Sequence, residues 1–236
     1  DQLKSEINRI STDTEFNTMK LLDGSLSNKV TIDDNNNTAK LTAVTAISDN
    51  LLEGDYTIEI SDSGVAATIL AGTDDNTTGA DDIVITGTVA MGNYRLDVAD
   101  LGSDKFDLTL YFNDNIVAQA SEQTLTADAT NPAEIELGGF KFQWVFNEGS
   151  AAVSDGVLNF SVTAGFEAVV RNSAGDSIGS IAVTGNITGN VNVGGFNISF
   201  DSSLEDGSTG VTFETKAVAF QIGANEGQMT KLAISD

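Results

Sequence analysis

The stretch GDYTIEISD, residues 54–62, decides the fold of this chain, because its pattern returns as GNYRLDVAD at residues 92–100. In both stretches a Tyr follows a Gly by two residues, and apolar residues then stand at every second position. Alternation with a period of two is typical of a strand that buries one face. The sequence therefore predicts two equivalent strands, 38 residues apart, that arose from one repeated β unit.

A second repeated pattern lies further along, where LGGFKFQWVF at residues 137–146 resembles VGGFNISF at residues 193–200. A Gly-Gly pair before an alternating run predicts a bulge or a tight hairpin corner. Short alternating runs separated by Gly, Asn, Asp and Ser occupy much of the remaining middle of the chain, and KFDLTLYF at residues 105–112 is the clearest. This spacing is typical of an antiparallel sandwich or a barrel-like sheet.

The two ends of the chain differ from this middle region. In the opening segment Leu3, Ile7 and Ile10 form an apolar stripe at helical spacing, which predicts one N-terminal helix. The closing segment FQIGANEGQMTKLAISD, residues 220–236, alternates, turns and alternates again, as a strand, a turn and a second extended segment do. We predict a mainly β protein in which antiparallel β domains are inserted into a small α+β stub that contains the helix.

The same reading divides the chain into three parts. Residues 1–28 and 216–236 would form the discontinuous stub, residues 29–122 a first β domain and residues 123–215 a second β subdomain. The boundary is suggested by residues 121–132, a polar segment that holds the only Pro. The alternative is that residues 29–215 form one elongated domain.

The end segments resemble bacterial flagellins. The strings TEFN at residues 14–17, KLLDGS at residues 20–25 and QIGANEGQ at residues 221–228 are similar to the part of the flagellin rod domain where its N-terminal helix ends and its hairpin begins, and to the returning segment. The resemblance covers about 42 residues at the two ends, while the middle resembles the variable outer domains of flagellins in style only. The long terminal helices of the family are missing, so we expect a piece that keeps the outer part of a flagellin.

This resemblance implies a structural subunit of the flagellar filament, extracellular, involved in motility and presenting a variable antigenic coat. It implies other flagellin subunits as partners, with the chain itself monomeric, and at most the edge of an innate immune receptor contact near Glu6 and Arg9. Phe16 and Ile222 would belong to the core of the rod. The polar candidates for subunit packing are Asn8, Arg9, Thr14, Asn17, Asn225 and Gln228.

Composition narrows the alternatives. With 11 Lys and Arg against 35 Asp and Glu, the net charge is −24, which argues against nucleic acid and anionic membranes as partners. The chain has no Cys and no His, so disulfides, Cys/His zinc sites and His-dependent catalysis are excluded. We expect neither an enzyme nor a bound cofactor. Glu59, Asp97 and Asp107 could form a carboxylate pair for glycoside hydrolysis, but one Trp and three Tyr are poor material for a sugar cleft.

Two further features have a functional and a structural interpretation. Acidic stretches at residues 33–37 and 74–82 supply oxygen ligands for a cation such as calcium, although Asp and Asn are also common in turns. The candidate ligands are Asp33, Asp34, Asp74, Asp75, Asp81 and Asp82. Trp144 lies in a stripe with Phe140, Phe142 and Phe146 that would be either a ligand platform or, as the period of two favours, the core face of a strand. The alternative function is an adhesin-like module that binds a glycan or a host protein, with or without calcium.

Overall fold

The computed structural model describes residues 2–13, 15–16, 19–20, 28–48, 50–70, 82–125, 133–144, 155–215, 218–221 and 229–232. Its only described helix is α1 (Gln2–Asp13). All described strand pairs are antiparallel. The prediction of a mainly β, antiparallel fold with one N-terminal helix is therefore confirmed.

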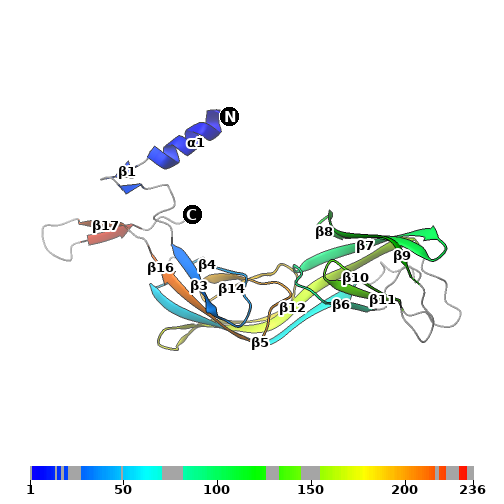
Figure 1. Cartoon of the computed structure of the whole chain (residues 1–236). Helices are drawn as coiled ribbons and strands as arrows, with labels where there is room; N and C mark the ends of the chain where they lie inside the picture. The colour runs from blue at the N-terminus through cyan, green and yellow to red at the C-terminus, as the bar shows by residue number, and fades with distance from the viewer. Residues whose placement is uncertain are drawn as a thin grey trace.

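An elongated eight-stranded sheet forms the body of the molecule (Figure 1). Its strands are β3 (Lys29–Asn37), β16 (Gly207–Glu214), β5 (Gly54–Ile69), β12 (Gly156–Asn172), β7 (Gly92–Gly102), β8 (Lys105–Phe112) and β9 (Asn115–Thr124), in that order, with β13 (Ser177–Asn186) paired to β12. The long strands β5 and β12 run through the whole body and connect its two halves (Figure 1).

Two small sheets lie against this large sheet, one over each half. One contains β10 (Ala133–Leu137), β11 (Phe140–Trp144) and β6 (Asp82–Ile85), and the other contains β14 (Asn190–Val193), β15 (Phe196–Ser199) and β4 (Ala43–Ala46). Aromatic rings join the layers: Phe140 packs edge-on against Phe160 at 5.1 Å in one half, and Phe196 against Tyr56 at 5.2 Å in the other. Each half is thus a two-layer sandwich with its own aromatic core.

The two halves have the same topology, and one is inserted into the other. The proximal unit consists of β3, β4, residues 54–60 of β5, residues 166–172 of β12, β13, β14, β15 and β16. The inserted unit consists of residues 65–69 of β5, then β6 to β11, then residues 156–164 of β12. The strands of the two units correspond in chain order. The first pair is β3 and residues 65–69 of β5, and the last pair is β16 and residues 156–164 of β12.

Strand register confirms this equivalence residue by residue. Tyr56 lies between Val211 and Asn172 in the proximal unit, as Tyr94 lies between Phe160 and Phe112 in the inserted unit. Both Tyr hydroxyls donate to the carbonyl four residues earlier, at 2.6 Å to Leu52 and 2.9 Å to Ala90. Such a bond pins the entry of a strand to the preceding loop, so the shared Gly-x-Tyr pattern has a structural cause.

The Gly-Gly pairs form equivalent two-residue hairpin turns. Gly138 and Gly139 have φ of 61° and 87°, and Gly194 and Gly195 have φ of 57° and 86°. Positive φ at both central residues is the requirement of the type I′ hairpin turn, which favours Gly. The turns join β10 to β11 and β14 to β15, so the tight hairpin corner expected from the sequence is confirmed.

The segments 29–122 and 123–215 share the large sheet. Strand β12, from the second segment, lies between β5 and β7, from the first. The strand pairing therefore crosses the expected boundary near residues 121–132.

The elements α1, β1 and β17 lie at one end of this body (Figure 1). There β1 (Glu15–Phe16) pairs with β2 (Met19–Lys20), and β17 (Val218–Gln221) pairs with β18 (Met229–Leu232). The body begins at Lys29 and ends at Glu214, and these two residues are partners in the β3–β16 ladder. The chain thus enters and leaves the body at one point, as an insertion requires.

Candidate functional site

The acidic segment at residues 33–37 lies within β3 and is not a turn. Gly210 pairs with Asp33 and Thr209 with Asn37, so residues 34–36 form a bulge at the edge of the sheet. The carboxylate of Asp33 accepts the backbone N–H of Asn35 at 3.1 Å and the side-chain amide of Asn36 at 2.6 Å. Asn37 is fixed by Leu41 and by the Thr209 hydroxyl at 2.8 Å. The acidic and amide groups here stabilise a bulge within a strand and not a turn.

The described residues contain no group of three or more acidic, His or Cys side chains that is placed to hold a metal ion. Asp82 is the exposed first residue of β6. Asp74, Asp75 and Asp81 lie outside the described residues. The structure thus brings Asp33 and Asp34 to one strand edge and gives them no further acidic partner within the part of the chain that it describes.

The three carboxylates considered for glycoside hydrolysis have structural partners. Glu59 binds Arg171 at 2.9 Å, and Asp97 binds Arg95 at 2.9 Å. Asp107 accepts the backbone N–H of Glu122 at 2.8 Å, beside a bulge in β9. Arg95 also stacks over the ring of Tyr111, with its guanidinium carbon 4.1 Å from the ring centroid. Glu59 and Asp107 thus join neighbouring strands, whereas Asp97 pairs with Arg95 within β7.

The aromatic stripe belongs to the core. Phe140 and Phe142 are fully buried, and Trp144 is only 1% exposed. Between them Lys141 and Gln143 face outward and bind Glu134 on the neighbouring strand. The core interpretation is confirmed for these three residues, which offer no platform to a ligand, and Phe146 lies outside the described residues.

The apolar stripe of α1 is exposed. Leu3 is 76% exposed and Ile7 58%, and Arg9 on another face of the helix pairs with Glu6 at 2.9 Å. This pair raises the pKa of Arg9 and lowers the pKa of Glu6. Side-chain surroundings of Asn8 and Phe16 are not described, and Thr14, Asn17, Ile222, Asn225 and Gln228 lie outside the described residues.

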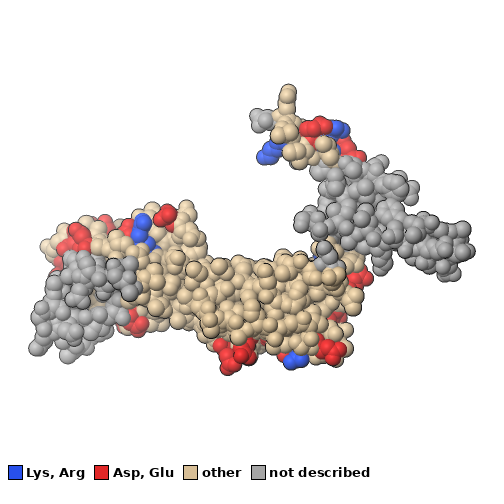
Figure 2. Space-filling model, turned by 180° about the vertical axis from the view of Figure 1, so that it is seen from behind, with Lys and Arg blue, Asp and Glu red and all other residues tan. Residues whose placement is uncertain are grey.

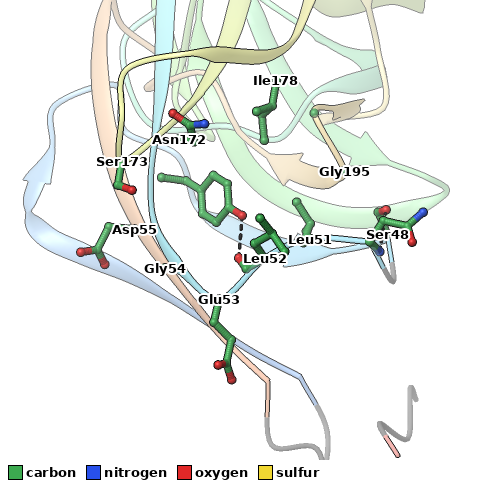
Figure 3. A pocket seen from close by; sticks show the side chains of 13 residues that line it. Ser48, Leu51, Leu52, Glu53, Gly54, Asp55, Asn172, Ser173, Ile178 and Gly195 are labelled. Carbon is green, nitrogen blue, oxygen red and sulfur yellow. Dashed lines mark hydrogen bonds between the residues drawn. The ribbon is translucent and has the colours of Figure 1, made fainter. Parts of the chain in front are cut away.

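A pocket of about 610 Å³ opens in the proximal unit, which the sequence analysis did not identify (Figure 3). It is lined by residues 48, 50–56, 172–173, 178 and 194–195. In Figure 3 Asn172 and Ile178 lie on one side of the hollow and Leu51 and Leu52 on the other, while Glu53 and Asp55 point outward. The dashed line is the hydrogen bond of Tyr56 to Leu52, so the pocket sits beside the Gly-x-Tyr entry of β5.

The only signal for this pocket in the sequence is the repeat itself. The repeat identifies Gly54 with Gly92 and Tyr56 with Tyr94, but the residue opposite Tyr56 is Asn172, on a strand that is distant in the sequence. A second, smaller hollow of about 250 Å³ lies in the inserted unit and is lined by residues 93–95, 111, 113–114 and 159. Burial raises the pKa of Tyr94 there.

Charge is unevenly distributed over the body. Figure 2 shows a face on which residues other than Lys, Arg, Asp and Glu cover the middle, with acidic residues gathered toward the ends and along one margin. The described helix is too short and too polar to cross a membrane.

Comparison with known proteins gives little guidance. No family model matches the chain, and no curated protein matches it. Among solved structures, the chain is similar to the D2–D3 domains of the flagellar cap protein FliD from Escherichia coli, with 11% identity over 80% of this chain and 100% of that one and a TM-score of 0.27. The similarity is thus to a flagellar component, does not single out flagellin, and is too distant to establish a shared fold or function.

Proposed function

We propose that this chain is the outer, surface-exposed part of a structural subunit of the bacterial flagellar filament. The observation that carries the proposal is the occurrence of flagellin-like strings at both ends of the chain, TEFN with KLLDGS and QIGANEGQ, around a body whose first and last strands pair. A β body that enters and leaves at one point can vary without disturbing the segments that polymerise.

The exposed stripe on α1 supports this role. Apolar side chains such as Leu3 and Ile7, exposed on a regular helix, are typical of a surface that packs in an assembly. In this proposal the partners are other flagellin subunits, which contact the stub, and the β body projects from the filament into the medium. The edge of an immune receptor contact would lie near Glu6 and Arg9.

Labelling of intact cells tests the proposal. Antibodies raised against residues 29–215 are applied to the source bacterium, and gold particles are located by electron microscopy. We expect label along the whole length of the flagella. Label confined to the flagellar tip would instead indicate a cap subunit, and label elsewhere on the cell would refute a flagellar role.

A second candidate is a binding module, and the pocket beside Tyr56 favours it. Both functions are compatible in one chain, because the pocket belongs to the projecting body and the polymerising segments do not line it.

A further inference from the structure

In the inserted unit, an aromatic ring fills the space above the Gly-x-Tyr entry. Phe112 lies opposite Tyr94, with ring centroids 4.8 Å apart and planes inclined by 34°. A Cβ on Gly92 would lie 2.8 Å from Cε2 of Phe112, so the Gly leaves the room that this ring occupies. The ring closes the end of the sandwich over Tyr94.

In the proximal unit the same frame has no such ring. Asn172 lies opposite Tyr56, in the place of Phe112, and a Cβ on Gly54 would meet nothing within 4 Å. The side-chain oxygen of Asn172 accepts the backbone N–H groups of Ala174 at 3.0 Å and Asp176 at 2.9 Å. The side chain of Asn172 is therefore held in the turn at residues 172–176. The space that corresponds to the Phe112 ring of the inserted unit is part of the pocket of about 610 Å³.

We propose that this pocket binds an aromatic six-membered ring, placed against Tyr56 as Phe112 is placed against Tyr94. Leu51, Leu52 and Ile178 supply apolar walls, and inclined aromatic pairs are favourable beyond the area they bury (Figure 3). The volume is within the range of small-molecule pockets. The ring comes from a free aromatic compound or from a Phe or Tyr side chain of a peptide.

Charge restricts the ligand further. Glu53 and Asp55 stand at the rim, and no Lys or Arg is among the residues that line the pocket. The chain as a whole carries a net charge of −24. The pocket therefore favours neutral and cationic rings over anionic ones, because an anion would approach two carboxylates in a pocket whose lining residues include no Lys or Arg. This inference goes beyond the proposed filament role and does not depend on it.

The test is an NMR titration of the methyl groups of Leu51 and Ile178 with three ring compounds: benzyl alcohol, phenethylamine and phenylacetate. We expect saturable shifts with millimolar dissociation constants for the first two, as small ligands of this size give, and at least about tenfold weaker binding of phenylacetate. A fourth titration with N-acetylphenylalaninamide separates the two sources, since binding of this compound alone assigns the ring to a peptide. Absence of saturable shifts with all four compounds would overturn the proposal.

Two variants close the pocket independently. Asn172→Phe places a ring where Phe112 stands in the other unit, and Ile178→Trp extends an indole across the hollow without touching the turn made by Asn172. Each is expected to weaken benzyl alcohol binding at least about tenfold, because the ring site is occupied. Ile116→Trp, at a position 54% exposed on β9, is the matched control and should bind as the parent does. Unchanged affinity in Ile178→Trp would show that the shifts arise elsewhere and would refute the assignment.

Discussion

The hairpin turn at Gly138 allows a sharp test of how the small sheet packs on the large one. The backbone there has φ of 61°, and a Cβ would lie 2.7 Å from Cδ2 of Leu110 and 3.1 Å from Cβ of Ala118. Gly185, in β13, has the same φ of 61° and nothing within 4 Å of a Cβ. Ala at the two positions therefore meets the same backbone penalty and a different packing environment.

The expected cost follows from these two terms. Placing Ala in the left-handed region destabilises the folded state by about 1–2 kcal/mol. Ala also lowers the conformational entropy of the unfolded chain relative to Gly, which stabilises the fold by about 0.4–1 kcal/mol. Gly185→Ala should therefore lower the free energy of unfolding by about 1 kcal/mol. Gly138→Ala adds overpacking against the buried Leu110, which costs a further 1–3 kcal/mol, roughly, for a total of about 2–4 kcal/mol.

Urea unfolding followed by circular dichroism measures both values, and a single transition with an unchanged slope is the condition for comparing them. Gly194→Ala repeats the test in the proximal unit, since a Cβ there would lie 2.8 Å from Cβ of Val170. Equal losses for Gly138→Ala and Gly185→Ala would refute the argument, because they would show that the hairpin can move off the large sheet at no cost.

Three further outcomes are expected. Tyr56→Phe and Tyr94→Phe each remove a hydrogen bond between a strand and the loop before it, and each should lower the free energy of unfolding by about 1 kcal/mol, measured by urea unfolding. No loss in either variant would refute a stabilising role of these hydroxyls. The backbone N–H of Ser63 donates to Asp206 at 2.7 Å and lowers the pKa of that carboxyl, so this contact stabilises the fold above the unfolded pKa and is lost as pH falls through the folded pKa. Asp206→Asn should therefore flatten the acidic part of the plot of melting temperature against pH. An unchanged plot would contradict this role of Asp206. A short Gly/Ser insert between the exposed residues Ser103 and Asp104 should lower the free energy of unfolding by about 1 kcal/mol, measured by a thermal melt. The same insert between Gly138 and Gly139 should cost more, because that turn packs closely on Leu110. The reverse order would refute this distinction between the two turns.

Local patterns in the sequence predicted much of the fold. The period of two placed Phe140, Phe142 and Trp144 on a buried face, and the structure leaves them at most 1% exposed. The Gly-x-Tyr and Gly-Gly-Phe repeats marked equivalent strands and turns before any pairing was known. These features succeed because backbone conformation and face alternation depend on residues that are close in the sequence.

Features that depend on register could not be predicted in this way. The segment at residues 33–37 resembles a turn in composition, yet it forms a bulge because Thr209 and Gly210 pair with its two ends. The pocket depends on Asn172 standing opposite Tyr56, which follows from the pairing of β5 with β12. The expected boundary near residues 121–132 marks a polar stretch, but β12 carries the chain back into the sheet of the first segment.

The nesting of the two units has a simple physical cause. An antiparallel pair brings the end of one strand beside the start of the next, so any folded segment whose own termini are adjacent can replace the turn between them. Lys29 and Glu214 are such a pair at the entry of the body, and Val65 and Ala164 are such a pair at the entry of the inserted unit. In the inserted unit the equivalent position is the turn between Gly102 and Lys105, which are again partners. Paired strand ends therefore stand at the entry of the body and again at the entry of the inserted unit. Each insertion leaves the strand pairs before it intact, so an outer domain can grow while the strands that connect it keep their register.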